Sequence, residues 1–279
     1  MRCYKIWLYR YEKMGPIGLE AAGMVLLFVF VVGLMAGFVD AIAGGGGLIM
    51  LPGLLFTGLP VSSAIATNKL CGTFGSLTSS VKFAQAKQID WRACALMGLP
   101  VALGAYWGSR SIDRLPSEWA EPVVIALIAA ITLFVVFNPG FGTAKPVTNR
   151  EPKTDLRKQV IWSLLTATAI GFHDGFFGPG TGIFLVFALI SIWPLDFLRA
   201  TGTAKVLNLV ANAIALTTFA LSGNIQYDKG LCGAAGVIIG SFIGATFATK
   251  KGTKLIKPLF IAVTTALVSK LLFDYATGR

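Results

Sequence analysis

The chain has 279 residues, of which 55% are hydrophobic and only 13% are charged, whereas charged residues make up roughly 25% of an average soluble domain. This composition excludes an ordinary soluble protein and predicts an integral membrane protein. The formal net charge of +11 would suggest nucleic-acid binding in a soluble chain. Here, however, the basic residues stand in short connections between apolar runs, as the positive-inside bias predicts. We therefore expect the lipid bilayer, and no nucleic acid, among its partners.

Ten apolar segments follow one another along the chain. They cover residues 17–43, 46–59, 61–81, 92–109, 119–138, 160–177, 181–195, 203–221, 231–248 and 256–274. These runs are too long and too little alternated for barrel strands, so the spans are predicted to be helical. A membrane-spanning helix needs about 20 residues, so the segments 46–59 and 181–195 are too short and are predicted to be broken or re-entrant. The fold class expected is an all-α integral membrane protein, a polytopic helical bundle of about 8 to 10 transmembrane segments.

The chain divides into four regions. Residues 1–16 form a basic N-terminal extension, in which Met14 is an alternative start to Met1. Residues 17–138 form a first transmembrane repeat and residues 160–274 a second one. The connector at 139–159 is rich in proline, glycine and charge, and is predicted to be a polar cytoplasmic linker.

The two transmembrane regions are predicted to be homologous repeats. A shift of 134 residues aligns Asp40 with Asp174, and after a short insertion a shift of 136 residues aligns Lys69 with Lys205. An alignment that holds along both halves under these two shifts indicates a tandem duplication, which is how many secondary transporters are built. Four crossings in each half would give parallel repeats and five would give inverted repeats, and the charges of the connections do not decide between them.

Each half repeats the same polar residues in the same order: an aspartate, a glycine cluster, and then threonines and a lysine. The first set is Asp40, Gly44, Gly45, Gly46, Gly47, Thr67, Asn68 and Lys69, and the second is Asp174, Gly178, Gly180, Gly182, Thr201, Thr203 and Lys205. Glycines that interrupt an intramembrane helix free backbone N–H groups, and the helix that restarts after them points its positive end at the gap. With the two lysines, these breaks are predicted to bind a small anion. The aspartates would pair with the lysines, cap helices or carry protons.

Other interpretations of these residues stay open. The glycines suit close packing between helices, the lysines suit snorkelling to a membrane interface, and the aspartates suit simple helix caps. Asn208 and Asn212 share a helix face with Lys205 and add hydrogen-bond donors to the predicted site. His173, the only histidine, stands beside Asp174, and these two residues are candidates for proton coupling. The pairs of glycines at 104 and 108 and at 240 and 244 are predicted to be helix-packing positions.

Sequence signals for enzymatic activity are absent. The chain has no HExxH, no Walker-type GxxxxGK[ST] and no GxSxG motif, and a single histidine argues against histidine-rich metal sites. We therefore predict no enzyme activity, no catalytic residues, no cofactor and no metal site.

Three stretches carry a resemblance to a known family. They are GFVDAIAGGGGLIMLPGLLFTGLPVSSAIATNK, its second-half echo GFHDGFFGPGTGIFLVFALISIWPLDFLRATGTAK, and GSRSIDRLP. The sequence resembles the TauE/SafE sulfite exporter family, also called the toluene sulfonate uptake permease family, nearest to its YfcA-like branch, over residues 20–274. This resemblance implies a multi-pass transporter of the bacterial inner membrane that moves sulfur-containing anions such as sulfite, sulfoacetate or organosulfonates.

The function predicted is therefore secondary transport of a small sulfur-containing or organic anion by alternating access between two repeats. An anion-selective, channel-like pore and a non-transporting membrane assembly or scaffold protein are the alternatives. The sequence leaves open whether the chain forms a homo-oligomer, and it determines neither the direction of transport nor the coupling ion.

Overall fold

The computed structural model describes residues 16–112, 122, 126, 155–193 and 195–251, and every regular element in these ranges is a helix. The long and short helices are α2 (Pro16–Ala43), α3 (Gly47–Leu55), α4 (Val61–Gln85), α5 (Trp91–Ile112), α7 (Leu156–Phe176), α8 (Thr181–Ile192), α9 (Phe197–Ser222) and α10 (Tyr227–Lys251). Each of the eight predicted segments in this part of the chain coincides with one of them. The predicted segments 119–138 and 256–274 lie outside the described residues, apart from residues 122 and 126.

The two segments predicted to be too short for a full crossing form short helices. Helix α3 has 9 residues and α8 has 12, whereas about 20 are needed to cross a bilayer. Gly46 precedes α3 and Gly180 precedes α8, so each short helix begins directly after a glycine. Gly180 has φ +85°, a left-handed conformation that favours glycine over every other residue.

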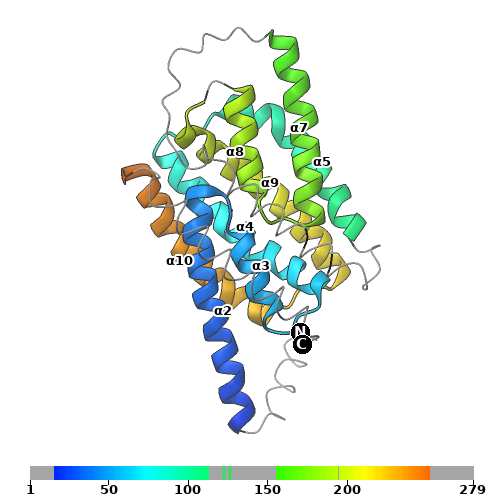
Figure 1. The fold of residues 1–279 in the computed structure, drawn as a ribbon, viewed down its shortest axis with the longest axis vertical. Helices are drawn as coiled ribbons and strands as arrows, with labels where there is room; N and C mark the ends of the chain where they lie inside the picture. Colours follow the sequence, from blue (N-terminus) through cyan, green and yellow to red (C-terminus); the bar gives the residue numbers. More distant parts are fainter. Residues whose placement is uncertain (1–15, 113–121, 123–125, 127–154, 194, 252–279) are drawn as a thin grey trace.

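The helices of the two halves interleave. Helix α2 packs along α10 and α5 packs along α7, so the first long helix of each half contacts the last described helix of the other half. Helices α4 and α9 cross in the middle and also pack against α10 and α5, respectively. Figure 1 shows α2 and α7 running in opposite directions along the long axis of the molecule. The short helices α3 and α8 lie between these long helices.

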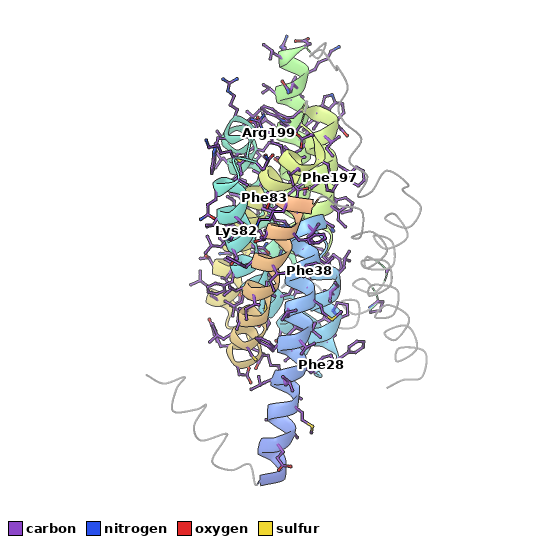
Figure 2. All side chains as sticks on the ribbon, turned by 90° about the vertical axis from the view of Figure 1, so that its left-hand side faces the viewer. Phe28, Phe38, Lys82, Phe83, Phe197 and Arg199 are labelled. Carbon is purple, nitrogen blue, oxygen red and sulfur yellow. The ribbon has the colours of Figure 1, made fainter. Side chains whose placement is uncertain are left out.

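The outer surface of the bundle is apolar. Among the described helices, α2 from Glu20, α9, and α10 up to Lys250 are long and apolar enough to cross a membrane, and α8 is apolar but shorter. Large hydrophobic side chains are exposed along the bundle, among them Leu27, Leu99, Trp107, Leu165 and Leu221. Phe28 of α2 is one that Figure 2 labels. Exposed apolar side chains on this scale are expected to face lipid. The polar residues of α4 and α9 are instead mostly buried between helices.

Close helix contacts depend on glycine, as the spacing of glycines at 104 and 108 and at 240 and 244 predicted. A methyl group on Gly104 or Gly108 of α5 would overlap a backbone carbonyl oxygen of α7, and one on Gly240 or Gly244 would overlap a carbonyl oxygen of α2. Small residues let two helix backbones approach closely in membrane proteins. The packing interpretation of these four glycines is therefore confirmed.

The α5–α7 contact gives a matched test on one helix. Gly108→Ala would place a methyl group against the carbonyl oxygen of Phe172, and overpacking of this kind typically costs about 1–3 kcal/mol. Gly98→Ala on the same helix would meet no described atom within 4 Å and gains about 1 kcal/mol of helix propensity. We expect a lower unfolding midpoint in detergent for Gly108→Ala and an equal or higher one for Gly98→Ala. Equal midpoints for the two variants would contradict this close contact.

Candidate functional site

The two glycine-rich breaks meet in the middle of the molecule. Helix α2 ends at Ala43 and the chain turns at Gly44, which has φ +79°. The backbones of Gly44 and Gly182 are so close that a Cβ atom on either glycine would lie 2.5 Å from the other's backbone. The breaks predicted from the sequence in the two halves therefore form one structure, in which each break packs against the other.

Two buried ion pairs cross between the halves beside these breaks. Lys69 of α4 donates to Asp174 of α7 at 2.7 Å, and Lys205 of α9 donates to Asp40 of α2 at 2.8 Å. Lys69, Asp174 and Lys205 are at most 1% exposed, whereas Asp40 is 19% exposed. The aspartates are thus salt-bridge partners of the lysines, one of the roles predicted for them. Snorkelling of the two lysines to an interface is wrong, because both ammonium groups are buried and paired.

These pairs change the electrostatics expected of the site. The sequence predicted that the two lysines would help to bind a small anion, but each ammonium group is paired with a carboxylate at hydrogen-bonding distance. The two lysines and two aspartates together carry no net formal charge. The positive potential that remains comes from backbone N–H groups and from the starts of α3 and α8, where helix dipoles favour an anion.

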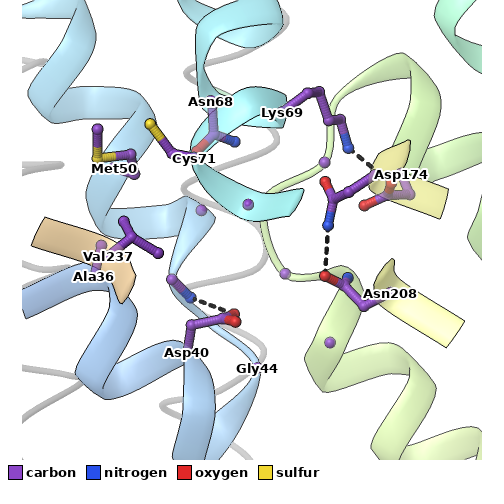
Figure 3. Close-up of a pocket in the computed structure, with 17 residues that line it drawn as sticks. Ala36, Asp40, Gly44, Met50, Asn68, Lys69, Cys71, Asp174, Asn208 and Val237 are labelled. Atoms are coloured by element: carbon purple, nitrogen blue, oxygen red, sulfur yellow. Dashed lines mark hydrogen bonds and ion pairs between the residues drawn. The ribbon is translucent and has the colours of Figure 1, made fainter. Parts of the chain in front are cut away.

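A cavity of about 40 Å³ lies between the ion pairs and the breaks (Figure 3). Its lining includes eleven of the residues predicted from the sequence, namely Asp40, Gly44, Gly46, Gly47, Asn68, Lys69, Asp174, Gly178, Gly180, Asn208 and Asn212. It also includes Ala36, Met50, Cys71, Gly72, Gly182 and Val237. The sequence indicated both glycines as neighbours of the site, because Gly182 belongs to the second glycine cluster and Gly72 aligns with Asn208 under the predicted repeat. Ala36, Met50, Cys71 and Val237 carry no such signal, because they read as ordinary core residues.

Several hydrogen-bond donors of this lining are unused within the described part of the chain. The backbone N–H groups of Gly47, Gly180 and Gly182 have no acceptor there, since each stands at the start of a helix. Asn68 is 7% exposed, lies beside Gly47, and its side chain has no hydrogen-bond partner among the same residues. Unpaired buried donors are costly, and donors that converge on one cavity are suited to an anionic oxygen.

The cavity wall differs between the halves at one pair of positions. Asn212 donates to the side-chain oxygen of Asn208 at 2.6 Å on α9, and the Asn212 amide lies against Gly72 of α4. The corresponding residues of α4 are Gly72 and Ser76, and the Ser76 hydroxyl donates to the carbonyl oxygen of Gly72 at 2.6 Å. The second half therefore contributes an amide pair where the first half contributes only backbone.

The remaining predicted residues lie outside the cavity lining. Thr67 accepts from the N–H of Gln226, and Thr203 accepts from the N–H of Asp90. Thr67 and Thr203 align with each other under the predicted repeat, and each binds the backbone just before a helix of the other half. The Thr201 hydroxyl donates to Phe197 within its own helix. Gly45 and Lys205 also do not line the cavity, although Lys205 holds Asp40, which does.

His173 lies beside the site but not in the cavity lining. Its Nδ1 is 3.3 Å from the Thr181 hydroxyl, and its ring contacts Phe177 and Phe184 edge to face. These contacts suit a structural role at the start of α8. Among the described residues, no group of three or more His, Cys, Asp and Glu side chains is placed to hold a metal ion.

Comparison with known proteins bears directly on this site, because both breaks and both lysines lie inside the matched region. The model of the family described as "Sulfite exporter TauE/SafE" matches residues 29–271. The chain belongs to this family. Family members of this kind are membrane transporters, and the apolar helices fit such a protein.

Curated relatives align over nearly the whole chain. A "Probable membrane transporter protein ORF9" of a Sinorhizobium species is 34% identical over 91% of this chain and 95% of its own length. A "Probable membrane transporter protein" of Haemophilus influenzae is 34% identical over 90% of this chain and 95% of its own. The "Probable membrane transporter protein YfcA" of Escherichia coli K12 is 30% identical over 90% and 91%. No solved structure matches the chain significantly.

The crossed pairing of the lysines predicts pair-specific coupling. Asp174→Asn leaves Lys69 buried without a counter-ion, and we expect the free energy of unfolding to fall by about 3–5 kcal/mol. Adding Lys69→Met should recover most of this loss, because the methionine needs no counter-ion. A double-mutant cycle in detergent, followed by unfolding, measures the coupling.

The matched control combines Asp174→Asn with Lys205→Met, two residues that form no ion pair with each other. The effects of these substitutions are expected to add rather than cancel. Recovery of stability in this combination, or none with Lys69→Met, would contradict the pairing described.

Proposed function

We propose that this protein is a secondary transporter that moves a small sulfur-containing anion, such as sulfite, sulfoacetate or another sulfonate, across the bacterial inner membrane. The observation that carries the proposal is the meeting of two broken helices at one cavity, with unused N–H groups from both. Discontinuous helices whose N-terminal ends face an anionic substrate are a recurrent feature of transporters. The family description and the relatives' names support transport as the activity.

Compact oxyanions suit the donors of the cavity. The N–H groups of Gly47, Gly180 and Gly182 and the amide of Asn68 provide several donors within a small volume. Hydrogen bonds to an ionised oxygen are about twice as strong as neutral ones. They would offset part of the desolvation cost of a buried anion. A sulfite or sulfonate group presents three oxygens on one centre and is able to use donors on both breaks at once.

The mechanism proposed is alternating access between two inverted repeats, each of several membrane crossings. Three observations support it. Helices α2 and α7 run in opposite directions. The first long helix of each half packs on the last described helix of the other half, α2 on α10 and α7 on α5, and each of the two ion pairs joins one half to the other. Inverted repeats require an odd number of crossings in each half. The long helices and the predicted segments 119–138 and 256–274 give such a number when the broken segments that contain α3 and α8 also count as crossings. Rocking of one repeat against the other would then open the cavity to each side in turn.

Transport is tested with purified protein in liposomes on a solid-supported membrane, challenged with sulfite, sulfoacetate, taurine, sulfate and chloride. Saturable currents for a sulfur anion, together with counterflow, would support the proposal. Flux that neither saturates nor shows counterflow would indicate a channel-like pore. No response from folded, monodisperse protein would overturn transport of these anions and favour an assembly or scaffold role.

Asn68 offers the cleanest variant for this assay, because its side chain takes part in no described hydrogen bond. Asn68→Ala removes a donor to the anion without breaking a hydrogen bond among the described residues. A hydrogen bond to a charged group contributes about 1.5–3 kcal/mol, so the half-saturating concentration is expected to rise by about tenfold or more, since tenfold corresponds to roughly 1.4 kcal/mol.

Asn224→Ala is the matched control, since Asn224 lies in the turn after α9, outside the cavity lining. It is expected to leave the half-saturating concentration unchanged. An unchanged value for Asn68→Ala as well would remove Asn68 from the proposed site.

A further inference from the structure

The carboxylate of Asp40 occupies a position suited to an anionic ligand. Its Oδ1 accepts the N–H of Gly46 at 3.1 Å, directly before α3, and its Oδ2 accepts from the Lys205 ammonium group at 2.8 Å. A backbone N–H at a helix start together with a lysine is the combination expected to hold a transported anion. Asp40 is therefore a resident anion of the first break (Figure 3).

The second break has no such occupant. Asp174, the repeat counterpart of Asp40, accepts from Lys69. Within the described part of the chain it accepts no N–H from the glycine segment that follows it. The N–H groups of Gly180 and Gly182 stay unused there. Asp40 already takes the N–H of Gly46 before α3, which leaves the Gly47 N–H as the unused donor of that break in the described cavity lining. A substrate anion thus finds most of its free donors at the start of α8.

The negative charge of the Asp40 carboxylate opposes the binding of a substrate anion. Two lysines and two aspartates leave the cavity without net formal charge, so an entering anion adds an uncompensated negative charge to a buried place. Burying an unpaired charge is costly. One proton on Asp40 restores the balance. It also weakens the contacts of Asp40 with Lys205 and Gly46, which releases both donors for the substrate.

We propose that Asp40 carries a proton that moves together with the substrate anion, in the same direction, an inference that rests on the transport function proposed above. The proton comes from the aqueous side on which the anion binds and adds to a carboxylate oxygen of Asp40. It leaves to the opposite side with the anion, after which the ion pair with Lys205 forms again. A monovalent anion then crosses without net charge movement, whereas sulfoacetate, which carries a sulfonate and a carboxylate at neutral pH, crosses with one net negative charge.

The sequence offers Asp40, Asp174 and His173 as proton carriers, and Asp40 suits this role best. Asp40 lines the cavity and is 19% exposed, whereas Asp174 is 1% exposed in its pair with Lys69. His173 is not in the lining.

The charged surroundings of Asp40 are simple in the described structure. Among the elements packed on α2, helix α9 provides Lys205 in direct contact, and α4 provides Lys69 across the cavity, paired with Asp174. Helices α3 and α8 carry no ionisable residue, and α10 carries its charged residues only near its two ends.

The test uses proteoliposomes that enclose a pH-sensitive dye, with sulfoacetate as the probe because it stays ionised at neutral pH. Addition of external sulfoacetate to the wild-type protein is expected to acidify the interior. Asp40→Asn, which keeps the shape of the side chain without a titratable group, is expected to lose the acidification at every sulfoacetate concentration that still gives counterflow. Asp196→Asn is the matched control, because Asn caps a helix as well as Asp does, and Asp196 caps α9 at the surface. It is expected to behave as wild type.

Each of the other outcomes would contradict one specific part of the proposal. Wild-type counterflow of sulfoacetate without acidification would overturn proton coupling and leave the transport function standing. Acidification that persists in Asp40→Asn would move the proton to another residue and overturn the role of Asp40. Where Asp40→Asn is not recovered folded, Asp40→Glu decides, since it keeps a carboxylate and must keep the acidification. Neither counterflow nor acidification with sulfoacetate or sulfite in the wild type would overturn the transport function itself.

Discussion

Two lysine–aspartate pairs, each joining one half of the chain to the other, constrain the centre of this protein. Lys69 with Asp174 and Lys205 with Asp40 lie beside the two glycine breaks, and three of the four side chains are almost fully buried. A buried charge without its partner costs about 3–5 kcal/mol. Neither half therefore provides the counter-ion of its own buried lysine. The halves must meet in one register, which places both helix breaks at the same cavity.

Glycine makes that register sterically possible. The contacts of α5 with α7 and of α2 with α10 bring backbones so close that an added methyl group would overlap a carbonyl oxygen. Gly44 and Gly182 repeat the same close approach between the breaks. Glycine thus serves two purposes here, close packing between long helices and the opening of short ones. Close packing therefore holds for the glycines of the long helices, and anion binding at the breaks stays a prediction.

The function proposed depends on where the two halves differ. In the first break the N–H of Gly46 is taken by Asp40, whereas in the second break Asp174 takes no N–H of the described glycine segment that follows it. The amide pair of Asn208 and Asn212 faces Gly72 of the first half. In the proposed mechanism, this difference between the halves would let a single anion bind at the second break. The anion would then be coupled to Asp40, the residue with which it competes.

The sequence by itself determined the helical class, the eight described segments, the two short helices and most of the cavity lining. Hydrophobic length and the recurrence of Asp, Gly and Lys are local properties of the chain, so they are visible without coordinates. Only the tertiary structure decided that the lysines are neutralised, and that each pairs with the aspartate of the other half. It also decided that Thr67 and Thr203 bind backbone outside the cavity. Ion pairing between residues more than 100 positions apart depends on how α2, α4, α7 and α9 pack. The spacing of residues along the chain does not indicate that packing.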